Sequence, residues 1–197
     1  MKIHSYRIVL TGLGGQGLVS LLQILGNALR IEGYKVITSE THGLSQRGGK
    51  VTCFLSFGNK LLAPIPMIGT ADMILALEEC TILDVLNFAK TDKSTNLIIC
   101  TYEKHEVDKD YPSLEYLLDT LYENSNNIYF IPAHEIAVDS LGNLQTMNIV
   151  ILGYILKFLP IKREIVENSL KEYFLGKGLE LNLKALSEGQ KLISKNF

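Results

Sequence analysis

The amino-acid sequence predicts an α/β protein, a three-layer sandwich in which helices cover both faces of a mainly parallel sheet. Two observations carry this prediction. Short apolar runs alternate with longer stretches whose apolar residues recur at helical spacing. The first run, 7–12, also passes through glycines directly into an apolar helical stretch. After Gly142 the pattern is helical throughout, which predicts a helical C-terminus. Because no long linker or internal repeat interrupts the 197 residues, we expect one domain, 1–197.

The N-terminal part is predicted to form a β-α-β unit. Residues 7–12 are a continuous apolar strand, and residues 16–30 form a helix with apolar side chains on most of its sides. Residues 35–39 make the second strand, which we expect to run parallel to the first. A helix this apolar must be covered on more than one side, and we expect the sheet and another subunit to cover it.

The next segment departs from the regular alternation. Residues 42–50 are polar and glycine-rich where a helix would ordinarily follow. Residues 51–57 alternate between apolar and polar types, which predicts a strand, and the short link favours an antiparallel or edge partner. The turn-forming residues 58–60 lead into the apolar residues 61–63. We therefore expect a β-hairpin insertion near 51–63.

The remainder of the chain returns to alternating elements. Further buried strands are expected at 71–77, 96–101 and 127–131. Helical spacing of apolar residues, with Pro112-Ser113 and Pro132 as start signals for two of the segments, predicts helices at about 82–89, 114–121, 133–141, 148–158, 162–174 and 182–193.

Charge and cysteine content exclude several classes of function. The chain has 19 basic and 21 acidic residues without a run of Lys or Arg, which argues against nucleic-acid binding. Cys53, Cys80 and Cys100 are far apart, so this chain alone cannot build a zinc knuckle or an iron–sulfur cluster. Thiols in apolar strands indicate a reducing, cytoplasmic setting. The apolar run 149–156 is far shorter than the ~20 residues that a membrane span needs.

The first candidate site is the glycine loop. Gly12, Gly14 and Gly17 fit the pattern G-x-G-x-x-G between a strand and a helix, where backbone N–H groups can hold an anion. Glu40 stands near the end of the second strand, where a dinucleotide-binding enzyme places an acid for the ribose. An independent NAD- or FAD-dependent oxidoreductase is therefore one hypothesis. The missing helical crossover after Glu40 counts against it, and a ligand-free tight turn remains open.

The second candidate site is a polar cluster in the segment 40–49. His42 can act as a base or as a hydrogen-bonded structural group. The guanidinium of Arg47 can contact a carboxylate, a phosphate or a partner protein, and the residues alone leave these readings open. The candidate residues of this cluster for binding a ligand or a partner are Glu40, His42, Gln46, Arg47, Gly48 and Gly49.

Three motifs give the chain a specific resemblance. They are Gly12-Leu13-Gly14-Gly15-Gln16-Gly17, Thr38-Ser39-Glu40-Thr41-His42-Gly43 and Ser45-Gln46-Arg47-Gly48-Gly49. In this order and spacing they resemble the gamma subunit of the 2-oxoacid:acceptor oxidoreductases, which act on pyruvate, ketoisovalerate, 2-oxoglutarate or indolepyruvate with ferredoxin as acceptor. The likeness continues through 71–78, 148–153 and 182–186 and so covers nearly the whole chain.

The resemblance implies an accessory subunit with a Rossmann-like fold that is inactive alone. In such complexes a 2-oxoacid is decarboxylated on thiamine diphosphate, the acyl group usually passes to coenzyme A, and electrons leave through iron–sulfur clusters to ferredoxin. Thiamine diphosphate, magnesium and the clusters are expected in partner subunits, the thiamine-binding alpha and beta chains. The resemblance implies no catalytic residue here. The candidates for ligand or partner binding are Gly12, Gly14, Gly15, Gln16, Gly17, Glu40, His42, Gln46, Arg47, Gly48 and Gly49.

Overall fold

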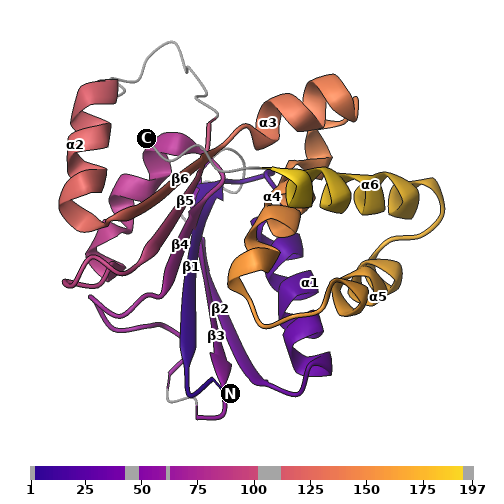
Figure 1. Cartoon of the computed structure of the whole chain (residues 1–197), viewed down its shortest axis with the longest axis horizontal. Coiled ribbons are helices and arrows are strands. Elements are labelled where there is room, and N and C mark those ends of the chain that lie inside the picture. Colours follow the sequence, from indigo (N-terminus) through magenta and orange to yellow (C-terminus); the bar gives the residue numbers. More distant parts are fainter. Residues whose placement is uncertain (1–2, 43–48, 61–62, 102–111, 193–197) are drawn as a thin grey trace.

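A six-stranded sheet forms the centre of the computed structural model, within the residues that it describes, 3–42, 49–60, 63–101 and 112–192 (Figure 1). β3 runs antiparallel to both of its neighbours, and the other five strands of this sheet all run in one direction. The predicted α/β fold with a mainly parallel sheet is therefore confirmed. In pairing order the strands are β2 (Lys35–His42), β3 (Lys50–Gly58), β1 (Tyr6–Leu13), β4 (Met73–Ala76), β5 (Asn96–Cys100) and β6 (Asn127–Ile131).

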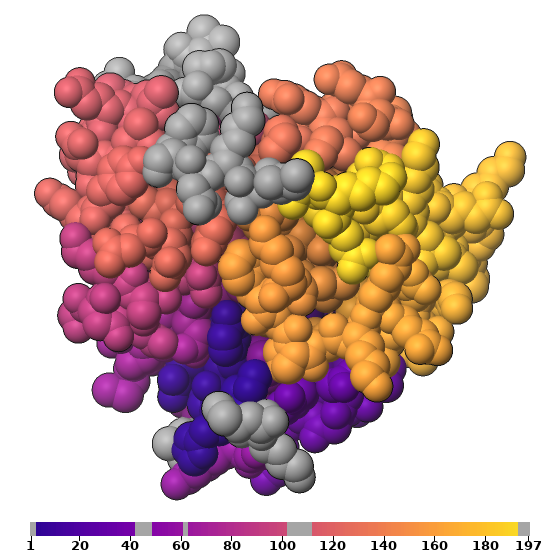
Figure 2. Space-filling view, viewed as in Figure 1, coloured from indigo at the N-terminus to yellow at the C-terminus, as the bar shows by residue number. Residues whose placement is uncertain are grey.

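Helices cover the sheet on both faces and make the outer layers of the sandwich (Figure 1). One face carries α1 (Leu18–Ile31), α3 (Ala133–Glu135) with the π-helical turn Ile136–Ser140, α4 (Met147–Ile155), α5 (Arg163–Tyr173) and α6 (Lys177–Lys191). The other face carries α2 (Leu114–Asn124) and two 3-10 segments, η1 (Glu79–Asp84) and η2 (Leu86–Phe88). The 3-10 turns η4 (Leu144–Thr146) and η5 (Leu156–Phe158) flank α4. On the face seen in Figure 2 the indigo N-terminal residues occupy a small area, which agrees with the position of β1 inside the sheet.

β3 lies in the interior of the sheet, while β2 forms its edge. β3 pairs antiparallel with β1 on one side and with β2 on the other. Most of its residues are buried, because its side chains are apolar on both faces, as with Leu55 and Phe54. A strand of this kind needs two neighbours, whereas β2 is partly exposed along its length. The expectation of an antiparallel or edge partner for residues 51–57 is therefore confirmed, since β3 pairs antiparallel with both neighbours and one of them, β2, is the edge strand.

The antiparallel hairpin is formed by β2 and β3 and not, as predicted, by β3 and the residues that follow it. After β3 the backbone N–H groups of Asn59 and Lys60 donate to the His4 carbonyl, so the chain is drawn toward the N-terminal segment. Ala63 lies outside any strand. The other two residues of the predicted partner strand, 61–62, lie outside the described residues.

The predicted helix at 82–89 is replaced by the two 3-10 segments η1 and η2. Glu78 caps η1, since its Oε2 accepts the N–H of Thr81 at 3.0 Å. The Thr81 hydroxyl donates to the Glu78 carbonyl at 2.7 Å, a local bond that competes with α-helical pairing. Val85, with φ −124°, separates the two segments. The apolar residues at the predicted spacing, Ile82, Val85, Leu86 and Ala89, are nevertheless buried, so the spacing located these core side chains correctly.

The apolar helix α1 is covered on two sides by its own chain. Its buried side chains contact the sheet on one side and α5 and α4 on the other. The C-terminal helices thus supply a layer on the side where another subunit was expected, and coverage by a partner stays a prediction. The last of them, α6, also begins at Lys177, five residues before the predicted start at 182.

All nine residues of α4 are buried, which accounts for its apolar character on every side. α4 packs closely against α6 and also contacts α1 and α3. Within the described ranges, no helix combines the length and apolarity that crossing a membrane requires.

Candidate functional site

The glycine loop lies where the chain changes from one face of the sheet to the other. β1 leads into α1 on one face, whereas its neighbour β4 leads into η1 on the opposite face. The ends of β1 and β4 are joined by the N–H of Leu77, which donates to the Thr11 carbonyl at 2.9 Å. In open α/β sheets such a switch point, outside the carboxyl ends of the strands, is the usual position of a ligand crevice.

Gln16 fills the turn that a ligand would otherwise enter. Its Oε1 accepts the backbone N–H of Leu13 at 2.7 Å, and its Nε2 lies 3.4 Å from the Leu77 carbonyl oxygen. A Cβ atom at Gly12 would lie 2.6 Å from Gln16 Oε1. Gly12 therefore provides room for the glutamine side chain of the same loop, and the side-chain amide occupies the position of a bound polar group.

Gly17 starts α1 in a left-handed conformation that Asn148 holds in place. Its φ is +80°, and a Cβ there would lie 2.4 Å from Asn148 Nδ2. That Nδ2 donates to the Gly17 carbonyl at 3.0 Å, which joins the first turn of α1 to α4. Gly15, also at positive φ, is exposed and has open space around it. The loop is thus rigid at Gly17 and accessible at Gly15.

Two shallow hollows flank the loop. One, of about 360 Å³, lies between residues 13–16 and Leu144, Gln145 and Met147 near the start of α4. The other, of about 290 Å³, lies between the loop, the first turn of α1 and Val51. Among the described residues no side chain caps the N-terminus of α1, so the positive end of its dipole lies beside this second hollow. Within the same residues, the surface around Gly15 is open on both sides.

Glu40 does not stand where a dinucleotide-binding acid would. In that arrangement the strand bearing the acid adjoins β1, but here β3 separates β2 from β1. Two strand spacings put Glu40 about 10 Å across the sheet from β1. Glu40 is instead exposed opposite Cys53, in register across β2 and β3. Burial raises the pKa of the Cys53 thiol to about 11, and the charge of Glu40 adds to this rise.

The two glycine clusters meet through their backbones. The N–H of Gly14 donates to the Gly49 carbonyl at 2.9 Å. The backbone of His42 pairs with Val51 at the end of β2, and Val51 in turn pairs with Gly12 of the loop. The side chain of His42 lies outside what the structure describes. Gln46, Arg47 and Gly48 also lie outside the described residues. The structure thus brings the two motifs together at Gly14 and Gly49.

This geometry agrees with the comparisons. The family model for the pyruvate ferredoxin/flavodoxin oxidoreductases matches residues 7–192. The chain belongs to this family. It is 32% identical to the indolepyruvate oxidoreductase subunit IorB of Archaeoglobus fulgidus over 190 residues, and this alignment covers 92% of each chain. It is 30% identical over 178 residues to the pyruvate/ketoisovalerate oxidoreductases common subunit gamma of Pyrococcus furiosus, covering 90% of this chain and 91% of that one.

A solved member of the family has the same fold. It is the keto/oxoacid ferredoxin oxidoreductase gamma subunit from Geobacter sulfurreducens PCA, with a TM-score of 0.68 and 23% identity, covering 93% of this chain and 95% of that one. The resemblance inferred from the glycine motifs is thus confirmed. The alternative of an independent NAD- or FAD-dependent enzyme receives no support from the family match or from the position of Glu40.

Asn148 is the site residue that the motif reading passed over. The sequence placed it at the start of a strongly apolar helix, and its amide holds Gly17 across 131 residues of chain. It is 3% exposed, and its Oδ1 has no partner among the described residues. The available signal was a polar side chain inside an otherwise apolar segment, because burying an amide is costly without a hydrogen bond.

Proposed function

We propose that this chain is the gamma subunit of a thiamine-diphosphate-dependent 2-oxoacid:ferredoxin oxidoreductase and is inactive alone. The observation that carries the proposal is the end-to-end match to subunits of such enzymes, at 30% identity or more. The complex would oxidatively decarboxylate a 2-oxoacid, usually to an acyl-CoA, and pass electrons to ferredoxin.

We place the cofactors in partner subunits because the described residues fit none of them. Within those residues no three His, Cys, Asp or Glu side chains gather where a metal ion could bind. Cys53 and Cys100 are buried in the core, where burial raises the pKa of Cys100 to about 12, and a cluster needs accessible thiolates. Thiamine diphosphate, magnesium and iron–sulfur clusters therefore belong to the alpha and beta subunits and their associates.

We assign the glycine loop and the 40–49 segment to contact with the thiamine-binding subunits or the acyl acceptor. The loop is held from inside by Gln16 and Asn148, and it exposes Gly15 between two open hollows. A loop fixed in this way can present backbone N–H groups without rearranging on contact, which lowers the cost of association. Its role is to complete an active site whose reacting groups stand on another chain.

The test is reconstitution of the complex. The alpha and beta subunits alone should reduce viologen with 2-oxoacid slowly, and adding this chain should restore the rate. Full activity without this chain would contradict the proposal.

A surface variant locates the contact. The test variant is Leu144→Glu, because Leu144 is 46% exposed and lines the hollow beside the loop. The control variant is Leu175→Glu, in the exposed link between α5 and α6. We expect Leu144→Glu to raise the chain concentration needed for half-maximal restoration at least tenfold, because a carboxylate would be desolvated there, and Leu175→Glu to leave it unchanged. If both variants needed the same chain concentration, this hollow would be excluded as the contact with the alpha and beta subunits.

A further inference from the structure

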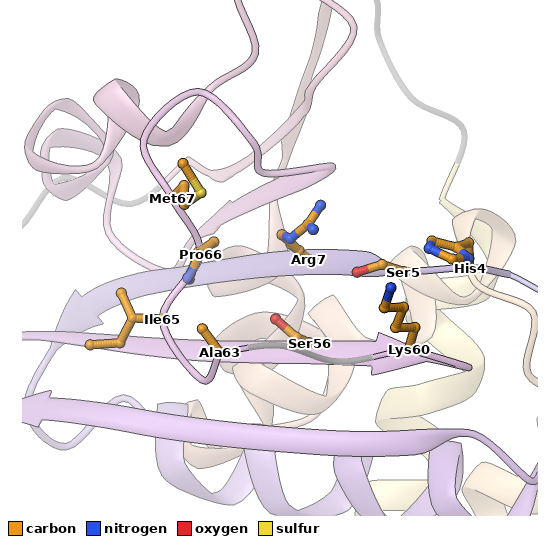
Figure 3. A pocket seen from close by; sticks show the side chains of 9 residues that line it. All are labelled: His4, Ser5, Arg7, Ser56, Lys60, Ala63, Ile65, Pro66 and Met67. Carbon is orange, nitrogen blue, oxygen red and sulfur yellow. The ribbon is translucent and has the colours of Figure 1, made fainter.

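A second cavity lies at the opposite end of the sheet from the glycine loop. It has a volume of about 160 Å³, and we call it the Arg7 pocket. Six residues of β1, 8–13, separate Arg7 from Gly14, a distance on the order of 20 Å along the strand. The pocket is therefore distinct from the site described above. It is lined by His4, Ser5, Arg7, Ser56, Lys60, Ala63, Ile65, Pro66 and Met67 (Figure 3).

The pocket has a polar end and an apolar end. In Figure 3 the side chains of Arg7, Ser5, Lys60 and His4 lie to one side, and those of the 63–67 segment lie to the other. Ser56 stands between them on β3 and is 3% exposed. Within the described part of the chain its hydroxyl makes no hydrogen bond, although it lines the cavity. Because Ser56 lines the cavity, its hydroxyl is available to donate a hydrogen bond to an incoming polar group.

The charge of the polar end is not balanced by the residues around it. Arg7 and Lys60 are cations, and none of the nine lining residues is acidic. The nearby carboxylate, Asp72, has both oxygens engaged: one accepts the backbone N–H of Arg7 at 2.8 Å and the other pairs with Lys90 at 2.5 Å. The Arg7 and Lys60 side chains have no acidic partner among the described residues. The pocket is thus complementary to a carboxylate or another anion.

The rim of the apolar end is too exposed to serve a small ligand alone. Met67 is 77% exposed and its neighbour Ile68 is 70% exposed, and Ile65 lies close by on the same segment. Adjacent apolar side chains on the surface, beside a cationic pocket, are typical of a protein interface, with an apolar centre and charged groups that orient the partner. The volume of about 160 Å³ also suits one side chain better than a cofactor.

We propose that the Arg7 pocket docks another subunit of the oxidoreductase complex through a segment that places an Asp or Glu side chain among apolar ones. This inference rests on the proposed function, since it requires a multi-subunit complex. The carboxylate would enter between Arg7 and Lys60 and accept the Ser56 hydroxyl proton in a hydrogen bond. The apolar neighbours would cover Met67 and Ile65. The chain would then hold its complex at both ends of the sheet, with catalysis assisted at the glycine end only.

The experiment measures binding of the full chain to its immobilised alpha and beta subunits. We compare the wild type with Lys60→Glu and Met67→Glu. The controls are Lys177→Glu, at the exposed start of α6, and Leu175→Glu, which replaces an exposed apolar residue between α5 and α6. We expect each pocket variant to weaken binding at least tenfold, and added salt to weaken the wild type more than Lys60→Glu. The controls should bind as the wild type does. All variants are first checked for an unchanged melting temperature.

A photocrosslinking amino acid at Met67 identifies the occupant. The expected product joins Met67 to a peptide of another subunit that contains Asp or Glu. Wild-type binding that neither pocket variant weakens, or a crosslink only to a second copy of this chain, would overturn the docking proposal and leave the proposed function standing. A wild-type chain that binds neither subunit would overturn both.

Discussion

The glycine loop is explained by a side chain inside it, Gln16. Its amide oxygen accepts Leu13 N–H, and the space that it occupies exists because position 12 has no Cβ. A pattern of glycines therefore has two physical causes that a sequence alone does not separate: close approach of a ligand, or close approach of a neighbouring side chain. Here the second cause accounts for Gly12, and the amide of Asn148 does the same for Gly17.

Gly17→Ala should destabilise the protein more than Gly15→Ala. Both positions have positive φ, so both substitutions incur left-handed strain of about 1–2 kcal/mol. Only at Gly17 does the new Cβ displace Asn148 and break its bond to the Gly17 carbonyl, adding about 1–3 kcal/mol. The measurement is the free energy of unfolding in urea. Equal losses in the two variants would show that Asn148 does not hold the loop.

At the scale of elements, local signals predicted some segments well and others poorly. The helix α2 followed from Ser113, whose hydroxyl does accept the Tyr116 N–H, and from Leu117 and Leu121, which are buried. The position of β3 could not be predicted, because strand order depends on pairing between distant residues and not on periodicity. The 79–88 segment was mispredicted because a threonine hydrogen bond outweighed helical spacing.

In the candidate site, too, the sequence predicted features that depend on neighbouring residues and missed those that depend on distant ones. The sequence located the glycine loop, which depends on neighbouring residues, but not its hydrogen bond to Gly49, which depends on the pairing of β1 with β3. It could not give the distance from Glu40 to β1, because that distance depends on the insertion of β3 between the strands. It also could not show Asn148, whose contact with Gly17 exists only once α4 has packed.

The packing of α4 on α6 depends on two glycines, and substituting either should separate the helices. A Cβ at Gly153 would lie 2.2 Å from the Leu186 carbonyl oxygen, and one at Gly189 would meet the backbone at Val150. Backbone cannot move aside cheaply, so Gly153→Ala should lower the melting temperature markedly. The control is Gly178→Ala, also on α6 but in open space, which should be neutral or stabilising by up to about 1 kcal/mol. A neutral Gly153→Ala would contradict this account of the packing.

At the scale of the whole molecule, the sheet separates two apolar cores, and the core on the α1 face contains two thiols. Cys53 on β3 and Cys100 on β5 are both buried there. Burial raises the pKa of Cys53 to about 11 and that of Cys100 to about 12, above the ordinary value of 9.0. For Cys53 the negative charge of Glu40 acts in the same direction. The free energy of unfolding therefore depends on the protonation of these two thiols.

Stability should fall as the pH rises above 9. Below pH 9 the thiols are protonated in both states, so their contribution is fully present. Between pH 9 and about 11 the unfolded chain releases protons that the folded chain retains, and each release favours unfolding. Tyr6, whose pKa burial raises from 10.0 to about 12, adds to the fall only above pH 10. The melting temperature, measured at pH 8 and pH 10, should thus decrease mainly through the thiols. The variant with Cys53→Ala and Cys100→Ala should lose less between these two pH values than the wild type, and an equal loss would locate the alkaline sensitivity elsewhere.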